Sequence, residues 1–249
     1  MKTRPFQSHR AGQGSRRQAH AFTLAEMLVV IVIIAIMAAI SLPRLRGLGE
    51  GNAMNAAVRQ LRDDVSLARQ KAISGRTTAV IVFIPPDITD AGVPQLDGGQ
   101  YTQYAILTMR DVGEQPGRAT QRFVTTWRSL PDKTFIATKF LDEGSAGSLL
   151  YRTFNLKSGL WFRMPYIAFN YEGRLIDLDA SDLGTGVYHT ENVVVPLARG
   201  AILFTRDTNG FVPDFSIQEI PPNNSTVSYN HIVIDWLTGR PKVDRPQLQ

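Results

Sequence analysis

The feature that most restricts this chain is an apolar segment near the N-terminus that holds a single carboxylate. Residues 27–40 are an unbroken run of 14 apolar residues, and between residues 22 and 42 only Thr23, Glu26 and Ser41 are polar. As a helix, these 21 residues would be about 31 Å long, the thickness of a bilayer core. An ionised acid at mid-bilayer costs about 2.5–3.5 kcal/mol and is usually functional, so Glu26 is expected to have a role.

The excess of positive charge lies entirely ahead of this segment. The chain has 249 residues with 27 basic and 22 acidic side chains, and residues 1–21 hold five of the basic ones and no acid. The rest of the chain therefore has 22 basic groups against 22 acidic groups. The basic, polar leader is expected to be a disordered cytoplasmic tail, and the remainder has no net charge that would attract nucleic acid.

Two interpretations of the apolar segment compete. In the first, residues 27–40 are the core of a secretory signal peptide that is cleaved after Ser41. In the second, the segment is kept as a membrane anchor and processing occurs at its cytoplasmic end. The anchor is favoured because a signal peptide gains nothing from Glu26, and because the run continues to Pro43 without a polar cleavage region.

The stretch AFTLAEMLVVIVIIAI resembles the N-terminal signature of type IV prepilins and type II secretion pseudopilins. The shared elements are a basic leader, a small residue, the pattern Phe-Thr-Leu-x-Glu at Phe22, Thr23, Leu24 and Glu26, and a long apolar helix. The resemblance implies that prepilin peptidase cleaves between Ala21 and Phe22 and that Phe22 is then N-methylated. Ala21 stands where the family usually has glycine; alanine is the next smallest side chain, so cleavage is expected to persist.

The resemblance also implies a role for Glu26 in assembly. In filaments of this family the acid faces the free N-terminal amine of a neighbouring subunit, and a carboxylate at that depth neutralises the cation in a low-dielectric setting. Pro43 matches a proline that is common in the family's long helix, although it also fits a simple membrane exit. Residues 22–43 are therefore expected to form a transmembrane and filament-core helix after removal of residues 1–21.

Residues 44–75 are expected to hold a joint and an amphipathic helix. Three glycines between residues 43 and 51 each cost a helix about 1 kcal/mol relative to alanine, which predicts a bendable or melted joint. From residue 52 to residue 73 the apolar residues follow i, i+3 and i+4 spacing, with Asn52 as a candidate N-cap and Gly75 as the helix end. The predicted apolar face, expected to pack against a sheet, consists of Met54, Ala57, Val58, Leu61, Val65, Ala68 and Ala72.

After Gly75 the sequence changes to the two-residue period of strands. Runs rich in β-branched and aromatic residues are separated by Pro, Gly or Asp, and residues 172–173 and 238–239 are expected to be hairpin turns. The predicted strands span residues 77–84, 101–109, 122–130, 133–140, 166–178, 200–206 and 230–243, and the predicted long loops span residues 85–100 and 180–192. A long helix followed by antiparallel strands predicts an α+β fold, with a β-rich head over residues 76–249.

This order of elements also resembles the GspH/FimT group of minor pseudopilins. The similar pieces are LARQKAISGRTTAVIVF at the junction of helix and first strand, and WRSLP, IAFNYEGRL and LTGRPKV in later strands and turns. Together with the N-terminal signature they cover about half of the chain, and residues 87–121 and 183–225 lie outside the resemblance.

The sequence has no catalytic constellation. GxSxG, P-loop and HExxH patterns are absent, the chain has no cysteine, and His231 lies in an apolar strand where a satisfied imidazole is the expected role. Asp63 and Asp64 are adjacent on a helix and point to different faces, so they are not expected to share a substrate. Enzyme activity, cofactors and nucleotide binding are therefore not expected.

A calcium site is an alternative interpretation of one loop. Asp207, Asn209 and Asp214 surround Gly210 and give part of the composition of a calcium-binding loop. They match no complete ligand pattern, and a turn is the preferred interpretation.

A DNA contact is an alternative interpretation of the basic residues 240–245. Arg240, Lys242 and Arg245 form a small basic group that would suit a DNA-uptake pilin. Such a pilin would bind DNA in a salt-dependent way that neutralisation of the three residues abolishes. Nucleic acid is not the expected partner, because no basic stripe interleaved with aromatic residues is present.

The function that these features predict is mechanical. The chain is expected to be a minor pseudopilin or pilin subunit of a type II secretion or type IV pilus-like filament, with a single pass through the inner membrane, its head in the periplasm, and extraction on assembly. Its expected partners are other pilin subunits, prepilin peptidase with its N-methyltransferase activity and, indirectly, the assembly platform and its ATPase. A secreted soluble domain is the alternative of a different class, and its mature N-terminus would be Leu42 or later.

Overall fold

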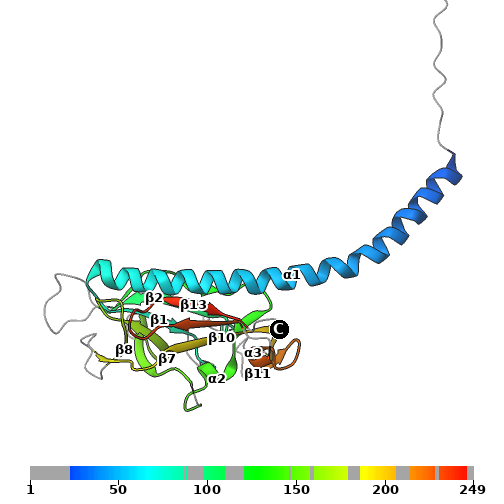
Figure 1. Cartoon of the computed structure of the whole chain (residues 1–249). Coiled ribbons are helices and arrows are strands. Elements are labelled where there is room, and N and C mark those ends of the chain that lie inside the picture. Colours follow the sequence, from blue (N-terminus) through cyan, green and yellow to red (C-terminus); the bar gives the residue numbers. More distant parts are fainter. Residues whose placement is uncertain are drawn as a thin grey trace, which may run out of the picture. The chain divides into compact units, whose positions relative to one another are not determined.

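The computed structural model describes residues 23–86, 88, 98–109, 121–145, 147–157, 160–178, 186–205, 214–227 and 230–245, without the side chains of residues 40–51, 157, 160 and 214 (Figure 1). The chain forms two compact units, Met1–Gly47 and Leu48–Gln249. The boundary between them falls inside the segment that the sequence predicts to be a joint.

The described residues form three helices and thirteen strands. The helices are α1 (Leu24–Gly75), α2 (Thr138–Leu141) and α3 (Asn224–Val227). The strands are β1 (Ala79–Phe83), β2 (Gln103–Thr108), β3 (Arg122–Phe123), β4 (Arg128–Ser129), β5 (Thr134–Ile136), β6 (Tyr151–Lys157), β7 (Leu160–Phe169), β8 (Leu175–Leu178), β9 (Gly186–Tyr188), β10 (Val193–Thr205), β11 (Asp214–Glu219), β12 (Asn230–Ile234) and β13 (Pro241–Asp244).

The strands form two sheets in which each described pair is antiparallel. The eight-stranded sheet has the order β3-β2-β1-β7-β8-β9, with β4 also beside β2 and β6 also beside β7. The five-stranded sheet has the order β11-β10-β12-β13, with β5 also beside β10. A long N-terminal helix followed by an antiparallel, β-rich head confirms the predicted α+β fold.

The C-terminal end of α1 is closed by a Schellman motif. Arg76 has a φ of 46°, its N–H donates to the carbonyl of Ile73 at 3.3 Å, and the N–H of Thr77 donates to the carbonyl of Ala72 at 3.1 Å. These two bonds satisfy carbonyl groups that the end of a helix leaves unpaired. The helix ends at Gly75 as predicted, although Arg76 and not a glycine takes the left-handed position.

The predicted helix start at Asn52 is wrong, because α1 runs without a break from Leu24 to Gly75. Residues 43–51, predicted to be bendable or melted, have a helical backbone. Each glycine weakens a helix by about 1 kcal/mol without sterically forbidding it. A proline inside a helix removes one hydrogen bond and crowds the carbonyl four residues earlier, at a cost of about 3 kcal/mol, which kinks a helix without necessarily ending it. A melted joint is thus not found, while bending of this segment stays a prediction.

The predicted packing face of the helix is confirmed. All seven of its apolar residues are buried, and the most exposed of them, Met54, is only 8% exposed. They belong to one cluster with Ile81 and Ile167 of the eight-stranded sheet and with Leu197 and Ile232 of the five-stranded sheet. The part of α1 in the head therefore lies along the strands and packs against both sheets (Figure 1).

The eight-stranded sheet is buried on both faces around β1. Ala79, Ile81 and Phe83 lie in the cluster that contains the helix, whereas Val80 and Val82 lie in a second cluster with residues of β6, β7 and β8. A strand with both faces buried needs apolar residues at successive positions, which explains the continuous apolar run of β1.

The remaining strand predictions succeed for long central runs and fail at the edges. The hairpins at residues 172–173 and 238–239 are confirmed by the pairing of β7 with β8 and of β12 with β13. The predicted strand 122–130 is divided into β3 and β4, and the predicted strand 133–140 contains β5 followed by α2. The sequence analysis missed β6 and β11, and β9 lies in a range predicted to be a loop. β6 and β11 each have one partner strand and mix polar with apolar residues, and β9 has only three residues, so their partners determine them.

The turns of these two hairpins meet beside the end of α1. Gly173 and Gly239 have φ values of 80° and 63°, and a Cβ on Gly239 would lie 2.0 Å from the carbonyl oxygen of Gly173. A Cβ on Gly173 would lie 2.7 Å from Cδ1 of Ile73, and Nε of Arg69 donates to the carbonyl of Thr238 at 2.6 Å. Both turns therefore need glycine, for its conformation and for the close approach.

Candidate functional site

The N-terminal end of α1 is held by reciprocal hydrogen bonds between Thr23 and Glu26. The N–H and the hydroxyl of Thr23 donate to Oε2 of Glu26, both at 2.9 Å, and the N–H of Glu26 donates to Oγ1 of Thr23 at 3.2 Å. This arrangement is a capping box, which satisfies N–H groups that a helix start leaves unpaired. Glu26 therefore has a local structural role that the sequence analysis did not include.

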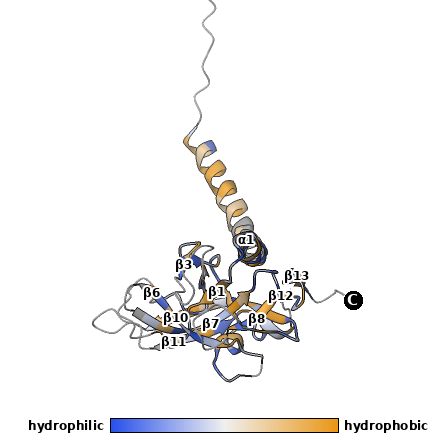
Figure 2. Cartoon of the chain, turned by 90° about the vertical axis from the view of Figure 1, so that its left-hand side faces the viewer, coloured by the Kyte–Doolittle hydropathy of each residue, from blue (hydrophilic) through white to orange (hydrophobic). Residues whose placement is uncertain are grey.

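Beyond this cap, α1 exposes large apolar side chains on all sides. The residues that are 48–84% exposed are Leu24, Met27, Leu28, Val29, Val30, Ile31, Val32, Ile33, Ile34, Ile36 and Met37. Figure 2 shows them as a continuous hydrophobic stretch of helix. A contiguous apolar surface of this kind marks a site of interaction with proteins or lipid. Judged on its described residues alone, none of the helices combines the length and hydropathy needed to cross a membrane.

The other residues predicted for processing and assembly are only partly described. Ala21 and Phe22, the predicted cleavage site, lie outside the described residues. Pro43 lies within α1, but its side chain is not described. The roles of these residues stay predictions.

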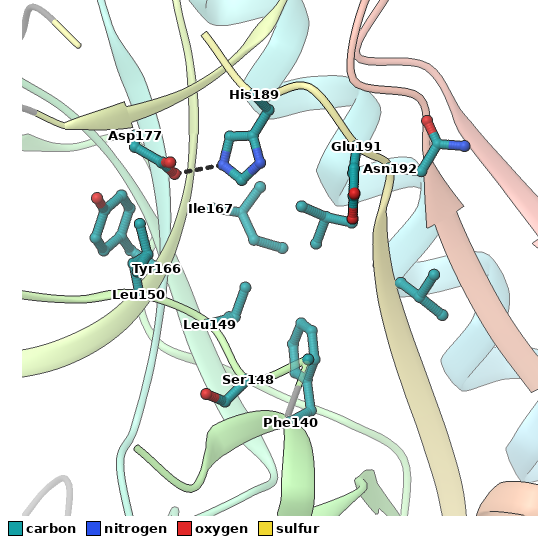
Figure 3. Close-up of a pocket in the computed structure, with 13 residues that line it drawn as sticks. Phe140, Ser148, Leu149, Leu150, Tyr166, Ile167, Asp177, His189, Glu191 and Asn192 are labelled. Atoms are coloured by element: carbon teal, nitrogen blue, oxygen red, sulfur yellow. Dashed lines mark ion pairs between the residues drawn. The ribbon is translucent and has the colours of Figure 1, made fainter. Parts of the chain in front are cut away.

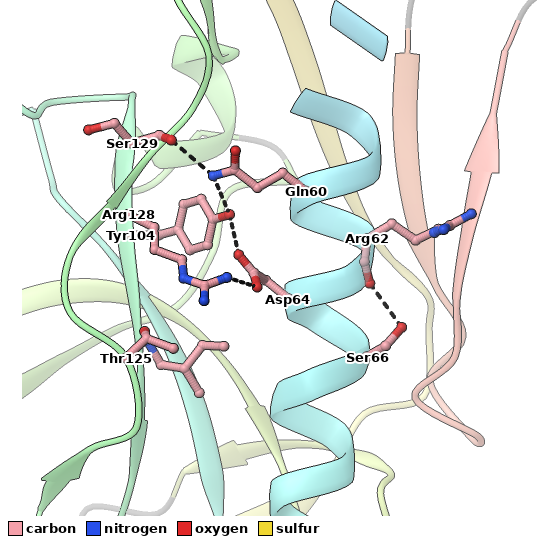
Figure 4. Close-up of polar contacts among 9 residues, drawn as sticks. Gln60, Arg62, Asp64, Ser66, Tyr104, Thr125, Arg128 and Ser129 are labelled. Atoms are coloured by element: carbon pink, nitrogen blue, oxygen red, sulfur yellow. Dashed lines mark hydrogen bonds and ion pairs between the residues drawn. The ribbon is translucent and has the colours of Figure 1, made fainter. Parts of the chain in front are cut away.

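A buried carboxylate joins α1 to the eight-stranded sheet, and the sequence analysis did not identify it. Asp64 is 3% exposed; the hydroxyl of Tyr104 donates to its Oδ2 at 2.6 Å, and Arg128 pairs with its Oδ1. Nε2 of Gln60 donates to the hydroxyl oxygen of Tyr104 at 3.1 Å and to the carbonyl of Ser129 at 2.9 Å (Figure 4). One connected set of polar contacts therefore ties the helix to β2 and β4.

The spacing of the helix does contain a signal for this burial. Asp64 lies three residues after Leu61 and four before Ala68, so it falls on the apolar face. Asp63 instead is exposed and pairs with Arg62 at 2.8 Å. The prediction that the two adjacent acids point to different faces is confirmed.

The buried hydroxyl in this network predicts a loss of stability in alkali. Burial, followed by the hydrogen bond to Asp64, raises the pKa of Tyr104 above its ordinary value near 10. The folded protein then keeps a proton that the unfolded chain has lost, so this contribution to stability is complete below pH 10 and declines above it. For one proton the free energy of unfolding falls by about 1.4 kcal/mol per pH unit.

In Tyr104→Phe, the fall in the free energy of unfolding between about pH 10 and pH 11 is expected to be smaller by about 1.4 kcal/mol. Urea unfolding at several pH values measures it, and Tyr171→Phe, at a tyrosine that is 57% exposed, is the matched control. Equal alkaline slopes for Tyr104→Phe and the unaltered protein would contradict the role of the buried hydroxyl.

The basic residues of the predicted DNA contact lie on and beside the edge strand β13. Arg240, Lys242 and Arg245 are exposed, and Arg245 donates to Oδ1 of Asn55 on α1 at 3.0 Å. Burial, followed by the charge of the nearby Arg240, lowers the pKa of Arg69. The structure thus spreads the three predicted residues along one sheet edge. Arg240 lies near Arg69 of α1, and Arg245 lies at Asn55, about 21 Å away along the same helix.

The residues of the predicted calcium alternative lie largely outside the described residues. Asp207 and Asn209 lie outside the described residues, and Asp214 begins β11 with its side chain undescribed. Across the described ranges, no group of three or more His, Cys, Asp or Glu residues is placed to hold a metal ion.

Both histidines of the head have polar partners. Nε2 of His231 lies 3.1 Å from the carbonyl oxygen of Ser225, so it is a satisfied imidazole as predicted. His189 follows β9, and its Nε2 lies 2.5 Å from Oδ1 of Asp177 on β8. The second pair lines a pocket of about 260 Å³ between the end of α2 and the strands β7, β8 and β10 (Figure 3).

Comparison with known proteins finds one match, at the N-terminus. Residues 16–42 match the family described as the prokaryotic N-terminal methylation motif, and this range includes Ala21, Phe22 and Glu26. No curated protein and no solved structure matches the chain. The motif marks a structural pilin-like protein and not an enzyme family. Together with the α+β architecture, it supports placing the chain in the family of type IV pilins and pseudopilins.

Proposed function

We propose that this chain is a minor pseudopilin or pilin subunit of the GspH/FimT kind, working in a type II secretion or type IV pilus-like filament. The observation that carries the proposal is the methylation motif at residues 16–42, which runs directly into a helix with exposed apolar residues on all sides. A helix of this kind needs lipid or other apolar helices around it. Lateral packing of such helices is how a filament of these subunits is built.

The steps of the proposal follow the chain from its N-terminus. Prepilin peptidase removes residues 1–21 on the cytoplasmic side and methylates Phe22. Residues 22–43 hold the protein in the inner membrane with its head in the periplasm until an assembly platform, driven by its ATPase, moves the subunit into the filament. The chain's own work is mechanical, as a filament subunit that initiates or caps the assembly or contacts secreted cargo.

Glu26 is the docking charge in this proposal. Its carboxylate lies one turn from the amine that cleavage at Phe22 creates, and a neighbouring subunit would bring its own new amine to the same depth. An amine left unpaired in an apolar filament core costs several kcal/mol, which the carboxylate offsets. The capping box supports the proposal because it holds the carboxylate at the helix start before a partner arrives.

Mass spectrometry of the intact native protein tests the processing step. We expect a mature chain that begins at Phe22 and carries one added methyl group. Ala21→Gly, which restores the residue that the family usually has, is expected to be cleaved at least as completely. A mature N-terminus at Leu42 or later would instead indicate a secreted domain behind an ordinary signal peptide and would overturn the proposal.

A DNA-uptake minor pilin is the second candidate, and the proximity of Arg240 to Arg69 favours it. Arg69 of α1 and Arg240 of the last hairpin then lie near each other, and two such cations would attract a phosphate backbone. The same processing and the same filament would serve both candidates, so the DNA contact would be an addition to the subunit role.

A further inference from the structure

The pocket beside His189 combines a buried apolar floor with an ionisable wall. Phe140, Leu149 and Ile167 form the floor and are 3–8% exposed. In Figure 3, Asp177 and His189 lie on one side of Ile167 and Glu191 on the other. A cavity with these two surfaces favours a ligand that is apolar along its length and charged at its end.

The charge of the wall is negative. Asp177 has His189 as its partner, but no hydrogen bond or ion pair joins Glu191 to any of the described residues. Glu191 is exposed at the pocket, so a cation that approaches it loses little hydration. The group that would complement the charge of Glu191 is therefore a cation.

The rim of the pocket indicates that the cation belongs to a protein. Leu150 and Val194 line the opening and are 50% and 39% exposed, which places large apolar side chains next to the charged wall. The volume of about 260 Å³ is below the roughly 300–1,000 Å³ of most small-molecule pockets, and it suits one long side chain. An apolar rim round a single-residue pocket is the usual form of an anchor site at an interface.

We propose that this pocket binds an arginine or lysine side chain presented by a partner protein. The aliphatic stem would lie against Leu149 and Ile167, and the charged group would pair with Glu191. A divalent cation is not the ligand, because the acidic residues and histidine on this wall do not form a metal-holding group. The proposal concerns the head alone and does not depend on entry of the chain into a filament.

The test is a titration of the full chain in detergent micelles with capped pentapeptides, followed through the methyl NMR signals of Leu149, Ile167 and Val194. The peptides have the sequence Gly-Gly-Xaa-Gly-Gly, with Xaa as arginine, lysine, glutamine or norleucine. We expect shifts at these methyl groups with the arginine and lysine peptides, and binding about three- to fivefold weaker for the glutamine and norleucine peptides.

The variant Glu191→Gln is expected to remove this preference without affecting the fold, because the side chain is exposed and has no described partner. Asp63→Asn, at an exposed acid on the far helix, is the matched control and should keep the preference. Equal binding of all four peptides, absence of methyl shifts at the pocket, or an unchanged preference in Glu191→Gln would each overturn the proposal.

Discussion

A Glu26→Gln variant is expected to be cleaved at Phe22 normally but to enter the filament at least about tenfold less than the unaltered protein. Glutamine keeps an oxygen that accepts the hydrogen bonds of Thr23, and Glu and Gln serve equally in a capping box. The substitution therefore removes the charge and keeps the helix start. An unpaired amine in an apolar core costs several kcal/mol, and each 1.4 kcal/mol is a factor of ten in the equilibrium.

Thr23→Ala is the matched control because it removes the cap and keeps the charge. Loss of an N-cap costs about 1 kcal/mol of local helix stability, so this variant should still assemble at a reduced level. Glu26→Ala removes both features and should fail as completely as Glu26→Gln. Quantifying each variant in sheared filaments against its processed pool in the membrane separates the two roles. Normal incorporation of Glu26→Gln would leave Glu26 with only its capping role.

Arg128→Met is expected to lower the free energy of unfolding of the head by about 1–3 kcal/mol. Asp64 is 3% exposed, and without Arg128 its charge would be buried with only the hydroxyl of Tyr104 as a donor. A buried charge left without its partner destabilises a protein by several kcal/mol, and water at the half-exposed Arg128 side reduces the cost here. Urea unfolding of the full chain in a non-ionic detergent measures the change.

Arg163→Met provides the control for a similar ion pair at the surface. Arg163 and Glu143 are 61% and 49% exposed, so this pair should contribute less than about 1 kcal/mol. In the Arg128→Met background, Asp64→Asn should recover part of the lost stability, since it removes the buried charge. An Arg128→Met variant as stable as Arg163→Met would show that Asp64 does not depend on its cation.

The helix could be predicted because the residues of its packing face lie close together in the sequence. The spacing that placed Leu61 and Val65 on one stripe needs only the 3.6-residue period, and the burial agrees. Asp64 lies on the same stripe, but its charge argued against burial. Its compensating partners, Tyr104 and Arg128, lie 40 and 64 residues away, and no local pattern connects them.

The pocket and the edge strands could not be predicted for the same reason. Phe140, Leu149, Ile167, Asp177 and Glu191 come from five separate parts of the chain, and only the pairing of the strands brings them together. The strand β9 is three residues long, and its pairing with β8 determines it more than its own sequence does. The N-terminal signature, in contrast, is contiguous in the sequence, so the sequence alone was sufficient to identify it.

The contact between the two glycine turns makes folding of this corner of the head depend on segments that lie far apart in the sequence. Until residue 239 has been synthesised, the turn at Gly173 lacks its close contact with Gly239, and Arg69 lacks the carbonyl of Thr238 that it binds. A nascent chain stopped before this point would have most of its strands but would lack the contact between the two turns at the end of the helix. A protease would therefore distinguish a truncated chain from a finished one at this corner of the head.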